Sequence, residues 1–163
     1  MNQLVRNEIA QPLKLLVITT AITGLVIGTT LAIGRTPQDT YVTPHWAVAI
    51  HLLTVIPALP LGAWVIFSKK GDALHRMLGK IWAVLMLVTS IDSFWIRDVT
   101  GHIGPIHIFS IVTLISLPMG IYAIRKGNVE GHRRAMRGTF IGLCVAGLFA
   151  LMPSRMLGNL IFG

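Results

Sequence analysis

Long apolar runs, separated by short polar connections, dominate the chain. An α-helix needs about 20 mostly apolar residues to cross a bilayer, and each run comes close to that length. The pattern predicts an all-α integral membrane protein with five transmembrane helices, at about residues 15–34, 46–67, 78–96, 106–124 and 136–152. Proline cannot donate a backbone hydrogen bond, so we expect Pro153 to end or kink the last helix. Pro57, Pro60 and Pro118 are expected to kink the second and fourth.

Composition supports the membrane interpretation and leaves no room for a domain outside the bilayer. Of 163 residues, 53% are hydrophobic and 12% are charged, whereas a soluble domain carries about 25% charged residues. The net charge of +8 does not indicate nucleic-acid binding, because the basic residues lie in the connections between apolar runs. Cys144 is the only cysteine, which excludes an intrachain disulfide and a Cys-x-x-Cys motif. We expect the first apolar run to be a retained helix rather than a signal peptide, because it is longer than a signal-peptide core.

The distribution of lysine and arginine predicts the orientation in a bacterial inner membrane. With a cytoplasmic N-terminus, only Arg35, Arg97 and Arg155 lie on the outer side, and the other eleven basic side chains lie on the inner side. Short cytoplasmic loops carry an excess of positive charge. We therefore expect the N-terminus in the cytoplasm and the C-terminus on the periplasmic or external side.

An internal repeat is the most informative feature of the sequence. Residues 50–55 align with 106–111 at an offset of 56. One residue inserted in the second copy shifts the alignment of the last match, His75-Arg76 with His132-Arg133. The matched polar residues are His51 with His107, Lys69-Lys70-Gly71 with Arg125-Lys126-Gly127, and His75-Arg76 with His132-Arg133. The repeat predicts two duplicated hairpins, at about 45–97 and 101–155, related by an axis along the membrane normal. Within a single transmembrane domain, they would form a four-helix bundle to which the first helix is an addition.

The repeat arranges four histidines in two pairs. His51 and His107 fall in the outer parts of the second and fourth helices, whereas His75 and His132 fall at the inner starts of the third and fifth. Two facing imidazoles are what a six-coordinate b-type haem requires, so all four are candidate cofactor ligands. His51 and His107 are the predicted axial ligands of the iron. Interhelical or quinone hydrogen bonding remains an alternative for them, and binding of lipid phosphate for the other two.

A carboxylate within the third apolar run adds a second polar site. Asp92 lies about one turn from the outer end of that helix, and a buried carboxylate is costly unless it is paired. Arg97 and Arg155 are candidate partners, and His51 and His107 lie near the same depth. The cluster is interpreted either as an ion pair that locks helices together or as a proton or quinone site beside a redox centre.

Several segments resemble a known family. They are His75-Arg76-Met77-Leu78-Gly79-Lys80-Ile81-Trp82, Ser93-Phe94-Trp95-Ile96, Ile106-His107 and His132-Arg133-Arg134-Ala135-Met136-Arg137-Gly138. Over residues 45–157 the chain resembles a bacterial family of predicted membrane proteins of unknown function. More distantly, its layout is similar to that of ascorbate-reducible transmembrane b-type cytochromes. This second resemblance implies one haem between His51 and His107 and another between His75 and His132.

These observations lead to one leading function and two alternatives. The leading hypothesis is a membrane b-type cytochrome-like electron-transfer protein that contains haem b and exchanges electrons with quinol. The alternatives are a non-catalytic accessory or assembly subunit of a respiratory complex, and a small proton-coupled transporter with a histidine–aspartate relay. Expected partners are membrane lipid, quinone, and a larger respiratory complex or further copies of the chain. The sequence assigns no enzymatic reaction.

Overall fold

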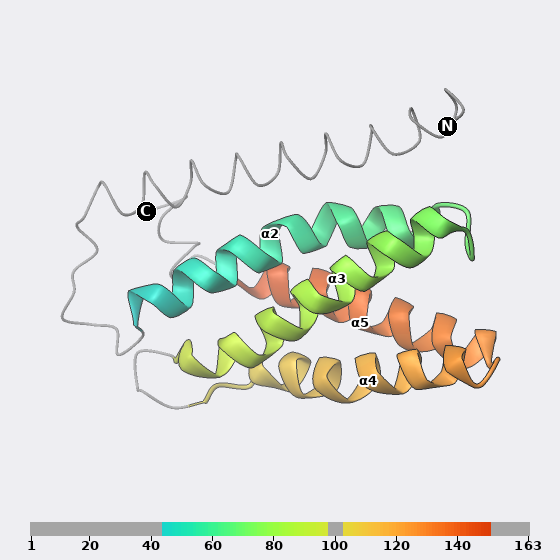
Figure 1. Ribbon diagram of the computed structural model, residues 1–163. Coiled ribbons are helices and arrows are strands. Elements are labelled where there is room, and N and C mark those ends of the chain that lie inside the picture. The colour runs from blue at the N-terminus through green and yellow to red at the C-terminus, as the bar shows by residue number, and fades with distance from the viewer. Residues whose placement is uncertain (1–43, 98–102, 151–163) are drawn as a thin grey trace, which may run out of the picture. The chain divides into compact units, whose positions relative to one another are not determined.

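The computed structural model describes residues 44–97 and 103–150, and its regular structure is entirely helical. The helices are α2 (His45–Phe67), α3 (Ala73–Asp92), the 3₁₀ helix η1 (Ser93–Trp95), α4 (His107–Arg125) and α5 (Val129–Ala150), as Figure 1 shows. The N-terminal helix predicted at about 15–34 lies outside the described residues. The all-helical prediction is confirmed for the part of the chain that the structure describes.

Three of the described helical segments are long and apolar enough to cross a membrane: Trp46–Phe67, Ala73–Trp95 and His107–Arg125. α2 continues through Pro57 and Pro60, and α4 continues through Pro118. The described part of α5 carries several charged residues near its start, and its apolar stretch runs on toward residues beyond Ala150. A membrane crossing by this helix therefore remains a prediction.

The bounds of α2 and α4 agree with the predicted helices to within one residue at each end. The other two helices begin earlier than predicted. α3 starts at Ala73 rather than at about Leu78, and α5 starts at Val129 rather than at about Met136. The additional turns carry polar residues, and an apolar run does not reveal them.

Side-chain caps explain both early starts. The Asp72 Oδ1 atom accepts a hydrogen bond of 2.7 Å from the backbone N–H of His75. The Asn128 Oδ1 atom accepts one of 2.8 Å from the backbone N–H of Gly131. Such caps satisfy backbone donors that have no partner within the helix, and so stabilise a polar first turn. Each helix can therefore begin outside its apolar run.

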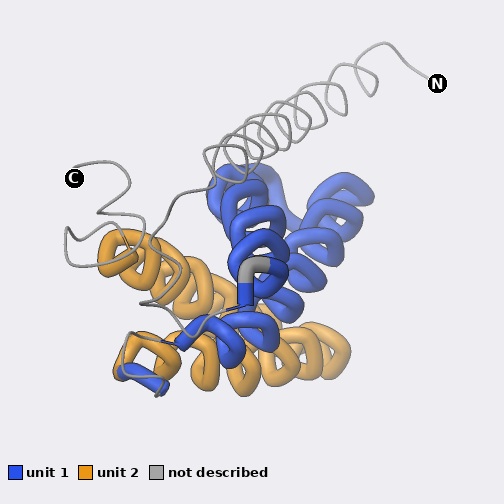
Figure 2. Tube along the Cα trace, turned by 90° about the vertical axis from the view of Figure 1, so that its left-hand side faces the viewer, with its two compact units in different colours: residues 1–104 blue, residues 105–163 orange. Residues whose placement is uncertain are grey.

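The chain divides into two compact units, residues 1–104 and 105–163 (Figure 2). Within the first unit α2 packs against α3, and within the second α4 packs against α5. Both pairs are antiparallel hairpins (Figure 1). We call them the first and the second hairpin and describe each by itself. Their assembly into a four-helix bundle remains a prediction.

The two connecting turns have the same backbone feature. Gly71 has a φ of 84° and Gly127 a φ of 76°, in the left-handed region that glycine adopts without a steric penalty. These two glycines are equivalent in the sequence repeat, and Asp72 and Asn128, which follow them, both cap the next helix. The matched turns support the proposed duplication.

The core of the first hairpin centres on Trp82 of α3. Its ring is almost fully buried, and its Nε1–H donates a hydrogen bond of 3.0 Å to the backbone oxygen of Ala58 on α2. A buried tryptophan needs a partner for this N–H, and here the partner ties the two helices together. Further buried apolar side chains of this hairpin are Leu61, Val65, Leu78 and Met86.

The two helices of the second hairpin approach each other closely where α4 carries a glycine. A Cβ atom added to Gly120 would collide with the Cε atom of Met136 and would lie 2.8 Å from the Cβ atom of Ala135. Only glycine therefore allows the two helices to approach so closely at this level. Leu117, Thr139 and Leu143 are buried in the same hairpin.

Candidate functional site

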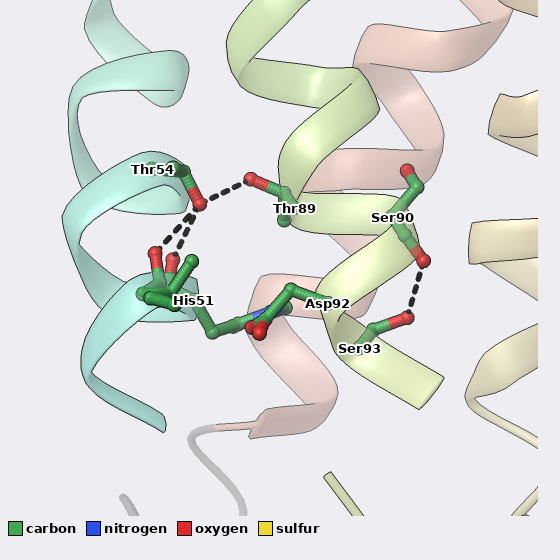
Figure 3. A network of polar contacts seen from close by, with 7 residues as sticks. His51, Thr54, Thr89, Ser90, Asp92 and Ser93 are labelled. Atoms are coloured by element: carbon green, nitrogen blue, oxygen red, sulfur yellow. Dashed lines mark hydrogen bonds and ion pairs between the residues drawn. The ribbon is translucent and has the colours of Figure 1, made fainter. Parts of the chain in front are cut away.

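The end of the first hairpin that lies away from its connecting turn brings a histidine and a carboxylate together. The Nδ1 atom of His51 on α2 lies 3.7 Å from the Oδ2 atom of Asp92 on α3, and Figure 3 shows the imidazole directed at the carboxylate. The Asp92 side chain is only 6% exposed and that of His51 is 26% exposed. The distance exceeds that of a direct N–H···O hydrogen bond but allows a strong electrostatic interaction at low dielectric. The structure thus brings the His51 imidazole to the Asp92 carboxylate, and the two form an ion pair when the imidazole is protonated.

The structure describes only one of the two arginines that the sequence suggests as partners of Asp92. Arg97 follows η1 and is exposed. Arg155 lies outside the described residues. The sequence also suggests His51 as a neighbour of Asp92 by depth, and the structure brings its imidazole to the carboxylate. The proton or quinone site proposed for Asp92, Arg97 and Arg155 stays a prediction.

The hydroxyl groups of Thr54 and Thr89 meet close to the His51–Asp92 pair, on the same two helices (Figure 3). Thr89 Oγ1 donates a hydrogen bond of 2.7 Å to Thr54 Oγ1, across the interface between α3 and α2. Thr54 Oγ1 in turn donates to the backbone oxygens of Ile50 and His51, at 2.9 and 3.1 Å. The Thr54 hydroxyl is thus engaged with the α2 backbone and with Thr89, whereas Asp92 faces the His51 ring.

The same end of α3 carries two buried serines. Ser93 Oγ donates a hydrogen bond of 2.8 Å to the backbone oxygen of Ser90, and both residues are buried. With Thr89 and Asp92 they make the end of α3 and the start of η1 polar, although this stretch belongs to a candidate membrane span. A polar stretch in such a segment is a functional candidate because hydrocarbon does not solvate it.

His107 is the repeat equivalent of His51 in the second hairpin. It is the first residue of α4 and is 4% exposed. The candidate span of α4 also begins at this residue. The described structure thus has a buried or half-buried histidine at the same repeat position of both hairpins.

His75 and His132 lie in the first turns of α3 and α5, next to the connecting turns. His132 Nδ1 is 3.0 Å from the backbone oxygen of Gly120, which ties the start of α5 to α4. A carbonyl oxygen only accepts, so Nδ1 carries the proton and the lone pair of the neutral ring is on Nε2. His75 is half-buried in α3 and donates its backbone N–H to Asp72. His75 and His132 each precede a core residue by the same spacing, Trp82 in α3 and Thr139 in α5.

The arrangement of His51 and His132 suits metal ligation by Nε2. Ligating histidines direct the other ring nitrogen at a carboxylate or a backbone carbonyl, which orients the ring and raises its basicity. Nδ1 of His51 faces a carboxylate oxygen and Nδ1 of His132 faces a carbonyl oxygen. Among the described residues no three His, Cys, Asp or Glu side chains gather around a possible metal-ion position, but a six-coordinate haem takes only two ligands from the protein.

A comparison with protein families identifies the chain. The model of a family described as "Predicted membrane protein (DUF2306)" matches residues 48–161. The chain belongs to this family. The match covers most of both hairpins, including all four candidate histidines and Asp92, and confirms that the chain is a membrane protein. No curated protein and no solved structure matches the chain.

Proposed function

We propose that this membrane protein is a b-type cytochrome-like electron-transfer protein in which His51 and His107 hold a haem iron. The observation that carries the proposal is the His51 imidazole, in a candidate membrane span, with its Nδ1 atom 3.7 Å from the buried Asp92 carboxylate. The haem would supply one-electron chemistry that no side chain supplies. The protein would position the iron ligands and adjust the local charge.

The carboxylate gives His51 the orientation and the tautomer that a ligand needs. With the proton on Nδ1, toward Asp92, the lone pair of the ring is on Nε2 and can bind iron. The charges are also complementary, because a buried carboxylate needs a nearby positive charge and a ferric haem centre supplies one. A bound iron would therefore give the His51 imidazole a ligand role and place a positive charge near the Asp92 carboxylate.

The second ligand follows from the duplication. His107 is equivalent to His51 in the repeat and is buried at the start of its own candidate span. The two hairpins also share the left-handed glycines Gly71 and Gly127 and a capping side chain directly after each. In the predicted four-helix bundle, the duplicated hairpins would present equivalent residues to a common axis, where His51 and His107 would hold the iron.

The inner histidines form a second candidate pair. The hydrogen bond from His132 Nδ1 to the Gly120 carbonyl leaves the Nε2 lone pair for a metal or for another donor. His75 has the same spacing to the core of its hairpin. In the orientation predicted for the bacterial inner membrane, this pair would lie toward the cytoplasm and His51 with His107 toward the outer side. Quinol at the outer side would then be the electron donor or acceptor, with its proton exchanged at Asp92.

The same geometry favours one further function, a proton-coupled transporter. A carboxylate beside an imidazole within a membrane span is the minimal unit of a proton relay. The two functions differ in one property, because the transporter needs no haem. Haem content therefore discriminates between them.

The experiment compares the visible spectra of the purified parent protein and of His51→Ala, His107→Ala and the double variant, with haem supplied during expression. We expect sharp, low-spin bands for the reduced parent, a high-spin spectrum for each single variant, and no haem at this site in the double variant. Thr54→Val is the matched control, because it removes a nearby hydroxyl and leaves both imidazoles. Its spectrum should be that of the parent.

Two outcomes contradict the proposal. A parent protein without haem would favour the transporter or an accessory subunit of a respiratory complex. An unchanged low-spin spectrum in the double variant would transfer the ligand role to His75 and His132. A further variant, Asp92→Asn, tests the role of Asp92 in positioning His51. The neutral amide should leave the low-spin bands in place. It should raise the midpoint potential of the haem, because a negative charge near the iron favours the ferric state.

A further inference from the structure

A stripe of exposed apolar side chains runs along α4 of the second hairpin. Its members are spaced three or four residues apart and therefore lie on one side of the helix. We call Ile108, Ile111, Ile115, Met119 and Tyr122 the α4 stripe, and they are 59, 47, 56, 64 and 62% exposed. Because α4 is a candidate membrane span, hydrocarbon chains are the natural neighbours of this stripe.

The stripe ends in positive charge. Lys126 follows Tyr122 by four residues, and its Nζ atom lies 5.7 Å from the centre of the Tyr122 ring. Arg125, the last residue of α4, is also exposed. Tyrosine with a cation beside it is typical of the boundary between hydrocarbon and headgroups. The same helix face is thus apolar along its length and cationic at its end.

Three arginines of α5 extend the positive charge. Arg133, Arg134 and Arg137 are exposed. The hydrogen bond between His132 and the Gly120 carbonyl places this part of α5 beside the last turns of α4. The guanidinium groups therefore belong to the same end of the second hairpin as Arg125 and Lys126.

The positive charge at this end is poorly neutralised within the described part of the second hairpin. Glu130 is the only acidic residue in the sequence from residue 99 to residue 163. It pairs with Arg133 at 3.2 Å, with both side chains at least half exposed, and such an exposed pair is weak. In the part of the second hairpin that the structure describes, the other four cations form no ion pair. They are available to an external anion.

We propose that this end of the second hairpin binds the phosphate headgroup of an anionic phospholipid, whose acyl chain lies along the α4 stripe. Guanidinium groups recognise phosphate through paired hydrogen bonds. An amphiphile matches both parts of the surface, whereas a soluble phosphate or an acidic protein segment would leave the stripe uncovered. The assignment is independent of the proposed haem.

The first hairpin provides a matched comparison. Its connecting turn contains Lys69 and Lys70, but Asp72 lies next to them in sequence and offsets part of their charge. Arg76 is engaged within the turn, because its guanidinium donates a hydrogen bond of 2.6 Å to the backbone oxygen of Gly71. We therefore expect the headgroup site at the second hairpin and not at the first.

The test measures lipid binding to the detergent-purified full-length protein by native mass spectrometry. The probes are phosphatidylglycerol, phosphatidylcholine with matched chains, and soluble glycerol 3-phosphate. We compare R133Q/R134Q/R137Q with the control K69Q/K70Q/K80Q, which removes the same charge from the first hairpin. We expect the arginine variant to bind phosphatidylglycerol at least tenfold more weakly, since three interfacial cations are removed and each of them adds to anionic-lipid binding. The control should bind it as the parent does.

Three results would overturn the proposal. Equal loss in the control would mean that only total charge matters. Equal affinity of the parent for phosphatidylcholine would exclude headgroup selection, and equal affinity for glycerol 3-phosphate would exclude a role for the acyl chain. If the glutamine variant does not fold, R133K/R134K/R137K keeps the charge but not the planar guanidinium fork. It should then weaken phosphatidylglycerol binding, and binding at the parental affinity would count against arginine recognition of the phosphate.

Discussion

Replacing Gly120 by alanine tests the close approach of α4 and α5. The new Cβ atom would collide with Met136 Cε and lie 2.8 Å from Ala135 Cβ, whereas carbon atoms in contact prefer about 3.5–4.0 Å. The Met136 side chain can turn away, but the Ala135 Cβ atom moves only with its backbone. The helices must therefore separate by several tenths of an ångström or more. That movement would lengthen the 3.0 Å contact between His132 Nδ1 and the Gly120 oxygen.

The magnitude follows from three contributions. Overpacking of this kind costs about 1–3 kcal/mol, and an interhelical hydrogen bond in a membrane protein contributes about 0.6 kcal/mol. Alanine has a higher helix propensity than glycine, which offsets about 1 kcal/mol. We therefore expect Gly120→Ala to lower the free energy of unfolding by about 0.5–2.5 kcal/mol.

Gly138→Ala is the matched control in the same hairpin. A Cβ atom at Gly138 would meet nothing within 4 Å, so this change should leave stability unchanged or raise it slightly. The assay is denaturant unfolding of both variants in the same detergent. Ala135→Gly combined with Gly120→Ala removes the contact with Ala135 Cβ and should recover part of the loss. Equal stability of Gly120→Ala and Gly138→Ala would refute the reasoning.

Two other predictions concern stability and topology. Trp82→Phe removes the indole N–H that bonds to the α2 backbone. It should destabilise the first hairpin by about 1–2 kcal/mol, because a hydrogen bond is lost and the ring is smaller. Denaturant unfolding that matches the parent protein would contradict this. Reporter fusions at Lys70 and Lys126 should read cytoplasmic and one at Asp98 external, because the basic connections stay inside, and the opposite signals would overturn the orientation.

The sequence predicted the bounds of a helix correctly only where the apolar run and the helix coincide. The runs predicted α2 and α4 to within one residue at each end. They missed the starts of α3 and α5, because the stabilising groups there are the polar caps Asp72 and Asn128. Both residues follow a glycine directly after a basic pair, and this turn pattern could have indicated the earlier starts.

The sequence predicted only part of the candidate site. The repeat selected His51 and His107 as equivalent, and the buried position of His107 is compatible with that selection. Two hydrogen-bonding relationships were not predicted: the contact of Thr89 with Thr54, and that of His132 with the Gly120 carbonyl. Both join different helices, and the side of a helix that meets its neighbour depends on packing.

The sequence by itself predicted the membrane class, the approximate helical segments of the two hairpins and the equivalence of the histidines in the repeat, because hydrophobic length, charge placement and repetition are properties of the linear chain. The tertiary structure alone decided that the Asp92 carboxylate faces His51, and that Gly120 sets the approach of α4 to α5. The physical reason is helical geometry. One residue turns a side chain by about 100° around the helix axis, so two residues at the same depth meet only if the packing of both helices brings their faces together.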